Sequence, residues 1–418
     1  MIRNSYNKKI IHCNLMQAFV STAHNENAAV VIHNTRSCSS IALRAYFGLR
    51  ERASGADTVK LGSGNNLFCT ALTDKDAVFG GGEKLEQCLL DICRVRNPEY
   101  ILVACGCVPG VVGDDTEAIC KTVREKTGVP ILLLPGAGFM VPGLLDMVLA
   151  ATDLLCKEFT YPLAGQVKRR DDTAVVIGLS NYYISRSVFE ELRESLTDLG
   201  ISVIYCPPVG ETKKEYQEMA SASLAISLCM GVVQKEAGRK LAEEFAGKLQ
   251  IPLLDMNASY EPADTVKILR IAGEKHKLGN DYDKKVDEKI KMFEQERQKA
   301  AALLHGRSCL IAAGLPFRFF MPLGTIRFLE SLGLSVTGFL LPETATAAKE
   351  NEADAFIKEH NLKMRCFRQD SVKESDADIL VTAMPLQTTL KQFVFQSQHF
   401  SLEGWCREIH RLTGLISG

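Results

Sequence analysis

Three cysteines stand in loops that follow short apolar segments, and they are the residues of this chain best suited to chemistry. Cys38 ends VVIHNTRSC, Cys69 follows NNLF, and Cys107 lies in YILVACGCVPGVVGDD. Thiolates presented from three separate loops suit an iron–sulfur cluster better than a disulfide. Clusters usually take four protein ligands, so three from one chain leave room for a ligand from a second chain.

Most of the other cysteines fit structural roles. The chain has 14 cysteines in 418 residues, without the spacing of a small disulfide framework. A large cytosolic chain keeps its thiols reduced, and cysteine packs well as a small apolar side chain. We therefore expect core packing for the cysteines in helix-like or strand-like segments. These are Cys88, Cys93, Cys105, Cys120, Cys156, Cys206, Cys309 and Cys366.

Charge, hydropathy and missing motifs limit the class of protein. Lys and Arg number 49 against 50 Asp and Glu, which argues against a nucleic-acid arm or a polybasic membrane surface. No apolar stretch has the length of about 18–20 residues that a membrane span needs, and the N-terminal segment does not resemble a signal peptide. Paired zinc-type cysteines, a G-x-S-x-G elbow and a complete dinucleotide fingerprint are also missing. We expect a cytoplasmic protein without nucleic-acid or membrane partners.

The elements that must position these cysteines alternate between apolar strands and amphipathic helices. YILVACG precedes a helix-like segment opened by Asp114 and Asp115, and TAVVIGLS precedes SRSVFEELRESLTDLG. This alternation predicts an α/β fold with mainly parallel sheets and right-handed crossovers. In such sheets ligands bind beyond the carboxyl ends of the strands, where we expect Cys107 and also Cys229, which ends SLAISLC.

We predict three Rossmann-like domains, each a parallel sheet flanked by helices, with boundaries near Gln166 and Gly306. A stretch rich in acidic and basic residues separates the second domain from the third and indicates a long helix. The predicted ranges are 1–166 for the first domain with the cysteine loops, 167–280 for the second, 281–305 for the linking helix and 306–418 for the third domain with a closing helix.

Taken together, these motifs resemble nitrogenase component 1, a superfamily of α- and β-type subunits and their cofactor-assembly homologues. The family has a cysteine six residues before GDD, as CVPGVVGDD has here. Its FGG before a helix matches AVFGGGEKL, and the cysteine preceding that motif matches Cys69. Its histidine-led loop ending in cysteine matches HNTRSC, from His33 to Cys38. Each motif is weak alone, but their order and spacing make the set specific.

The resemblance implies that Cys38, Cys69 and Cys107 bind an iron–sulfur cluster shared between two subunits. Gly81 and Gly106 would let the backbone approach such a cluster without a clash of Cβ, and ordinary turn formation is the alternative.

The resemblance also implies a second site, although the chain departs from the family there. Cys229 matches the cysteine that holds the metallocofactor in catalytic and scaffold α-type relatives, so it would bind a substrate or a second metallocluster, with core packing as the alternative. His399 is the candidate for the C-terminal histidine ligand, with a capping or solvent-facing role as the alternative. AGLPFRFF keeps Arg318 but lacks the family's histidine, and Asn34 and Arg36 change the family's HGP loop. These changes argue against nitrogen reduction.

The leading hypothesis is a subunit of a nitrogenase-like two-component oxidoreductase, in a hetero- or homodimer with a second nitrogenase-like subunit. Its interfacial cluster would receive low-potential electrons from a separate iron–sulfur ATPase reductase, because this chain has no phosphate-binding loop of the GxxxxGK[ST] type. The alternative is a non-catalytic scaffold that matures a metallocluster for another enzyme. A third hypothesis is a degenerate subunit that supports a catalytic sister chain.

Overall fold

The computed structural model describes most of the chain. The described residues are 25, 27–40, 66–137, 144–177, 186–205, 212–229, 231–257, 261–312, 322–341, 345–369, 372–373, 376–382, 386, 388–395 and 399–417. They form two compact units. One comprises the described residues within Ile11–Cys229 and Gln234–Met256, and the other is formed mainly by Asn257–Gly418.

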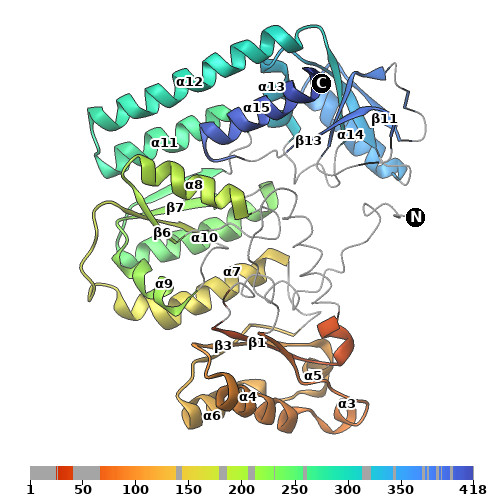
Figure 1. Cartoon of the computed structure of the whole chain (residues 1–418). Helices are drawn as coiled ribbons and strands as arrows, with labels where there is room; N and C mark the ends of the chain where they lie inside the picture. Colours follow the sequence, from red (N-terminus) through yellow and green to blue (C-terminus); the bar gives the residue numbers. More distant parts are fainter. Residues whose placement is uncertain are drawn as a thin grey trace. The chain divides into compact units, whose positions relative to one another are not determined.

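The first sheet carries the cysteine loops. Its strands are β1 (Ala29–His33), β2 (Leu67–Cys69), β3 (Ile101–Cys105) and β4 (Ile131–Leu133), in the spatial order β2-β1-β3-β4. The β1 strand pairs in parallel with both β2 and β3, and β3 pairs in parallel with β4. Two helices, α4 (Gly82–Arg96) and α6 (Thr116–Thr127), pack beside one another against this sheet (Figure 1).

Both faces of the first sheet are buried, which explains why its strands are apolar at every position. On β3, Ile101 and Val103 pack with Leu85 and Leu89 of α4. The alternate residue Leu102 joins a larger core on the opposite face. Because successive side chains of a strand face opposite ways, a sheet covered on both sides needs continuous apolar runs rather than alternating ones.

The second sheet belongs to the same compact unit. Its strands β5 (Thr173–Ile177), β6 (Ser202–Tyr205), β7 (Leu224–Cys229) and β8 (Leu253–Asn257) lie in the order β6-β5-β7-β8. The accompanying helices are α7 (Leu144–Leu155), α8 (Arg186–Asp198), α9 (Lys213–Glu218) and α10 (Gly231–Leu249). A continuous apolar core joins Leu102 of the first sheet, Leu155 of α7 and Val175 of the second sheet. The first two sheets are therefore packed as one body.

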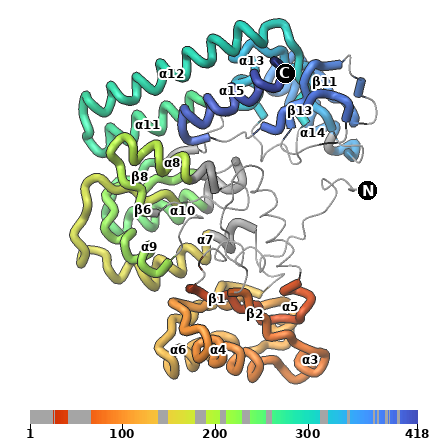
Figure 2. Tube along the Cα trace, in the orientation of Figure 1, coloured from red at the N-terminus to blue at the C-terminus, as the bar shows by residue number. Residues whose placement is uncertain are grey.

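The other unit contains a five-stranded parallel sheet, shown in blue in Figure 2, with the order β11-β10-β9-β12-β13. Its strands are β9 (Ser308–Ala312), β10 (Ser335–Leu341), β11 (Arg365–Arg368), β12 (Ile379–Thr382) and β13 (Lys391–Val394). Its helices are α11 (Pro262–His276), α12 (Asn280–Leu304), α13 (Pro322–Ser331), α14 (Ala347–Glu359) and α15 (Leu402–Ser417). The long α12 packs along α15.

The predicted α/β fold with parallel sheets flanked by helices is confirmed. The three sheets lie within residues 29–133, 173–257 and 308–394, and the domain boundaries near Gln166 and Gly306 stay predictions. In the described part of the chain no helix is both long enough and apolar enough to cross a membrane.

The strand order places the carboxyl ends of β1 and β5 at points where the chain reverses its direction across the sheet. From β1 the chain passes to β2 on one side, and β3 then lies on the other side of β1. From β5 it passes to β6, and β7 then lies on the other side of β5. The crevice beyond such a point is the usual ligand position in open α/β sheets.

Candidate functional site

The three predicted cluster ligands lie at one edge of the first sheet. In the parallel register Ile32 pairs with Cys69. Cys69 ends β2, Cys38 lies in the helical segment 36–40 just after β1, and Cys107 begins α5 (Cys107–Val112) just after β3. All three thiols are free and half-buried. Because β1 lies between β2 and β3, the carboxyl ends of adjacent parallel strands bring the three loops together.

Asn34 contacts the residues around all three cysteines. Its side-chain Nδ2 donates to the sulfur of Cys38 at 3.1 Å, and its backbone carbonyl oxygen accepts from the thiol of Cys69 at 3.5 Å. A Cβ atom on Gly106 would lie 2.2 Å from Cγ of Asn34. Gly106 has an ordinary extended backbone (φ −85°, ψ −175°), so space and not conformation requires glycine before Cys107.

A buried histidine–carboxylate pair connects the loops at this edge of the sheet. His33 is fully buried, and its Nε2 lies 3.0 Å from Oδ2 of Asp114. Its Nδ1 lies 3.0 Å from the hydroxyl of Thr70. The backbone N–H of Gly81 donates to both oxygens of Asp114, at 3.0 and 2.9 Å. These four residues, which we call the His33–Asp114 clamp, join the ends of β1 and β2 to the glycine turn and to the GDD motif.

The clamp also explains the glycines of the FGGG motif. A Cβ atom on Gly81 would lie 2.5 Å from a methyl group of Leu72 and 3.2 Å from the His33 ring. Gly80 has φ +90°, and a Cβ atom there would lie 2.8 Å from Oδ1 of Asp114. The turn therefore needs glycine to approach the buried pair closely. The predicted approach of Gly81 to a cluster stays a prediction.

Burial keeps the clamp histidine neutral. Removal from water lowers the pKa of His33, although the neighbouring Asp114 carboxylate acts in the opposite direction. A carboxylate can only accept a hydrogen bond, so the ring proton lies on Nε2 and faces Asp114. Nδ1 then accepts from the hydroxyl of Thr70.

The remaining described cysteines differ from these three in their surroundings. Burial raises the pKa of the Cys88 thiol to about 11 and that of Cys120 to about 12, so both stay protonated near neutral pH. The expected core packing is confirmed for four buried cysteines, which are Cys105, Cys120, Cys156 and Cys309. Cys88, Cys93 and Cys366 are half-buried, and Cys206 lies outside the described residues.

The donor set at the sheet edge fits an iron–sulfur cluster. No group of three or more His, Cys, Asp or Glu among the described residues is placed to hold a single metal ion. Cluster ligands bind different iron atoms, however, so they need not converge on one point. All three thiols are half-buried, and N–H groups donate to the sulfurs of Cys38 and Cys69, as hydrogen bonds to sulfur do in cluster sites. Besides the amide of Asn34, the backbone N–H of Ala71 donates to the sulfur of Cys69 at 3.3 Å.

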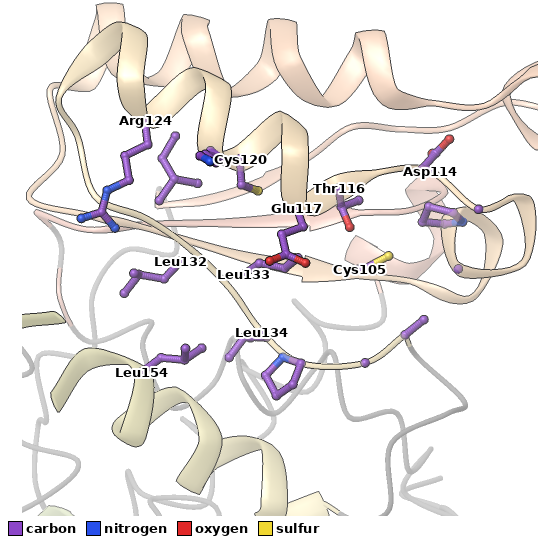
Figure 3. A pocket seen from close by; sticks show the side chains of 18 of the residues that line it. Cys105, Asp114, Thr116, Glu117, Cys120, Arg124, Leu132, Leu133, Leu134 and Leu154 are labelled. Atoms are coloured by element: carbon purple, nitrogen blue, oxygen red, sulfur yellow. The ribbon is translucent and has the colours of Figure 1, made fainter. Parts of the chain in front are cut away.

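An open cavity of about 970 Å³ borders Asp114 of the clamp (Figure 3). Polar side chains of α6, among them Glu117 and Arg124, line one side, and leucines such as Leu134 line another. Cys105 and Asp114 also belong to its wall. The cavity is therefore bordered both by Asp114 of the clamp and by side chains of α6.

The predicted second site is only partly described. Cys229 is the last residue of β7, at the carboxyl edge of the second sheet beside β5, and its side chain lies outside the described part of the structure. His399 is 2% exposed and packs edge-on against Trp405, with 5.0 Å between the ring centroids. Burial excludes the solvent-facing alternative, and Ser401 is the residue that caps α15, through its hydroxyl and the N–H of Gly404. Arg318 lies outside the described residues.

Sequence reasoning missed two residues of this site. Asp114 and Asp115 were both expected to open a helix, but only Asp115 caps α6, by accepting from the N–H of Ala118 at 3.1 Å. Asp114 instead accepts from His33 and Gly81. Asn34 was noted only as a departure from the family's glycine. A polar residue directly after a buried strand was the available signal for it.

The fold and the site together define a class of protein. It is a parallel α/β protein with thiol-bearing loops at the carboxyl ends of its first strands. The chain belongs to the nitrogenase component 1 type oxidoreductase family, whose sequence model matches residues 13–393.

Curated relatives and a solved structure agree with this family. The chain is 26% identical over 290 residues to the nitrogenase iron-molybdenum cofactor biosynthesis protein NifE of Clostridium pasteurianum, covering 68% of this chain and 59% of that protein. It is 25% identical over 308 residues to NifE of Methanosarcina barkeri, covering 71% and 63%. The chain thus spans less than two thirds of the length of these relatives. A structure entitled "Nitrogenase Cp1 at pH 6.5" has the same fold, with a TM-score of 0.67 over 97% of this chain and 92% of that chain at 15% identity.

Proposed function

We propose that this chain is one subunit of a scaffold that holds and matures a metallocluster for another enzyme. Three half-buried thiols on adjacent loops, two of them hydrogen-bonded to Asn34, carry the proposal. The relatives named as cofactor biosynthesis proteins favour the scaffold over the two-component oxidoreductase that the sequence placed first.

In this proposal Cys38, Cys69 and Cys107 hold an iron–sulfur cluster, and a second nitrogenase-like subunit supplies the remaining ligand. The bound cluster would supply one-electron transfer and a site for exchange of metal and sulfide. The thiol of Cys69, which donates to the Asn34 carbonyl, loses its proton on ligation. The N–H groups of Ala71 and Asn34 then remain as donors to the ligating sulfurs.

Exposed apolar side chains support a protein partner at this edge. Phe79 of α3 (Asp76–Phe79) is 79% exposed, and Val111 of α5 is 72% exposed. The two short helices contact each other, and α5 begins with the ligand Cys107. Apolar side chains exposed on two contacting helices favour burial of that surface by a protein partner. A separate iron–sulfur ATPase reductase would be a further partner, delivering electrons to the cluster.

Cys229 is proposed to belong to a second cluster-binding or substrate-binding position. Its place at the carboxyl end of β7, where the chain reverses direction across the second sheet, supports this role. The thiols at 38, 69 and 107 would then hold the resident cluster, and Cys229 would contact the cluster under maturation.

The proposal is tested by anaerobic production of the chain with its partner subunit, followed by iron and acid-labile sulfide analysis. We expect iron and sulfide in the wild type and a severalfold loss in Cys69→Ala, because a removed thiolate is not replaced by another donor. Cys93→Ala is the matched control. Cys93 is also half-buried, but it lies near the end of α4, away from the carboxyl edge of the sheet.

Two assays then separate the scaffold from the oxidoreductase. Transfer of the bound cluster to a cluster-free acceptor, with recovery of acceptor activity, supports the scaffold. Multiple turnovers of a small-molecule substrate with reductase and ATP, without cluster transfer, would support the oxidoreductase instead. Full iron content in Cys69→Ala would refute the ligand assignment in both cases.

A further inference from the structure

Asn34 is buried and held in place by its own backbone. It directly follows β1 and is 2% exposed. Its N–H donates to the carbonyl of Ile32, and its carbonyl accepts from the N–H of Leu72 at 3.0 Å. The side chain fills the space beside Gly106, where a Cβ atom would overlap it. The carboxamide therefore has little freedom to turn away from the sulfur of Cys38.

The orientation of the amide is informative. Nδ2 lies 3.1 Å from the Cys38 sulfur, while the buried Oδ1 has no hydrogen-bond partner among the residues that the structure describes. A thiol could donate to Oδ1, which would satisfy that oxygen. A sulfur bound to iron carries no proton and can only accept. With Nδ2 at 3.1 Å from the sulfur, Asn34 is placed to donate to a thiolate at Cys38.

We propose that Asn34 tunes the reduction potential of the cluster by donating an N–H···S hydrogen bond to the Cys38 ligand. The inference rests on the proposed function and concerns a position where the family motif has glycine, which has no side-chain donor. Reduction of a bound cluster by one electron from a low-potential donor would increase the negative charge on its thiolate ligands. The donor stabilises this reduced state more than the oxidised state, so it raises the potential.

The test is a redox titration of the anaerobically purified complex, with the iron–sulfur spectrum as readout and dithionite as the electron donor. Asn34→Ala removes the donor, and we expect the midpoint potential of the clusters that the variant binds to become more negative. A tenfold change in the equilibrium constant for one-electron reduction corresponds to about 59 mV, and a shift of this order is expected. Asn34→Asp also places a negative charge beside the sulfur and should give a larger shift in the same direction.

Thr35→Val is the matched control. The hydroxyl of Thr35 lies 3.8 Å from the same sulfur and also bonds to Ser37, so it is a weak donor to Cys38 at most. We expect this variant to keep the wild-type potential. An equal shift in Thr35→Val and Asn34→Ala would mean that the potential responds to general perturbation of the loop and would overturn the inference.

A compensation experiment tests the packing of the same side chain. Gly106→Ala should lower cluster content because the added methyl group overlaps Asn34, and Asn34→Gly in the same chain should restore it. The restored double variant should still show the more negative potential, because its cluster lacks the donor.

The outcomes separate the inference from the proposed function. Absence of iron and sulfide from the wild-type complex would refute both the proposed function and the inference. A fully loaded Asn34→Ala variant with the wild-type potential would overturn the inference and leave the cluster site intact. A variant that loses iron, while its remaining clusters keep the wild-type potential, would assign Asn34 a structural role and also overturn the inference.

Discussion

Two neighbouring residues at the end of β1 perform different tasks, because consecutive side chains of a strand lie on opposite sides of it. Asn34 contacts the sulfur of Cys38, whereas His33 pairs with Asp114 and Thr70 in a fully buried position. A buried polar group is stable only when it is hydrogen-bonded, and the clamp satisfies both nitrogens of His33. At this scale the thiols are the proposed ligands, and the buried polar residues fix the ends of the loops that carry them.

The neutral state of His33 predicts a pH dependence of stability in the cluster-free protein. Its pKa in the folded state lies below the ordinary value of 6.5, so between these two pKa values the unfolded chain binds a proton that the folded chain does not. Stability should therefore fall as the pH drops from about 6.5, by at most about 1.4 kcal/mol per pH unit. Urea unfolding at pH 7.5 and 5.5 measures this fall. His33→Gln should weaken the dependence, and an unchanged dependence would contradict the assignment.

The GDD motif combines three structural tasks in one short connection between helices. Gly113 ends α5 with a left-handed backbone, at φ +82°. Asp114 belongs to the clamp, and Asp115 caps α6. The short α5 is thereby held against the end of β3, with the thiol of Cys107 at its first position. The motif thus orients the loop that carries Cys107.

Alanine variants of Asp114 and Asp115 should distinguish the role of the clamp from that of the helix cap. Asp115→Ala removes an exposed N-terminal cap and should cost about 1 kcal/mol, with iron content unchanged. Asp114→Ala leaves the N–H of Gly81 and the ring of His33 without their charged acceptor, and should cost about 3 kcal/mol. Denaturant unfolding and iron analysis check both. Equal effects of the two variants on stability and iron content would contradict the distinction.

The whole chain consists of two compact units, of which one contains the cysteine loops and the other the third sheet. The second unit has its own aromatic core, in which Trp405 packs 4.7 Å from Phe328 between ring centroids and donates to the hydroxyl of Thr265. Separate cores of this kind allow the units to unfold at different denaturant concentrations.

Trp405→Ala should reveal this independence. Loss of a fully buried tryptophan should destabilise the second unit by about 3–5 kcal/mol. We expect an early unfolding transition for that unit, followed by a later one for the unit with the first two sheets. Circular dichroism combined with limited proteolysis can assign the transitions. A single transition shifted as a whole would show that the two units unfold together.

The sequence by itself determined the parallel α/β fold, because apolar strands and amphipathic helices alternate with regular spacing. It also indicated the family and the three loops that bear Cys38, Cys69 and Cys107, since their motifs occur in a characteristic order. These features are local, so they can be read along the chain.

Only the tertiary structure decided which residues hold these loops. His33 meets Asp114 across 81 positions of the chain, and Asn34 excludes a side chain at Gly106. Both contacts depend on β1 lying beside β3, which pairs strands that are far apart in the sequence. Local sequence cannot distinguish Asp114 in a clamp from Asp115 at a helix cap, because both are aspartates at the start of a helix. The difference arises from the partners that folding brings to each carboxylate.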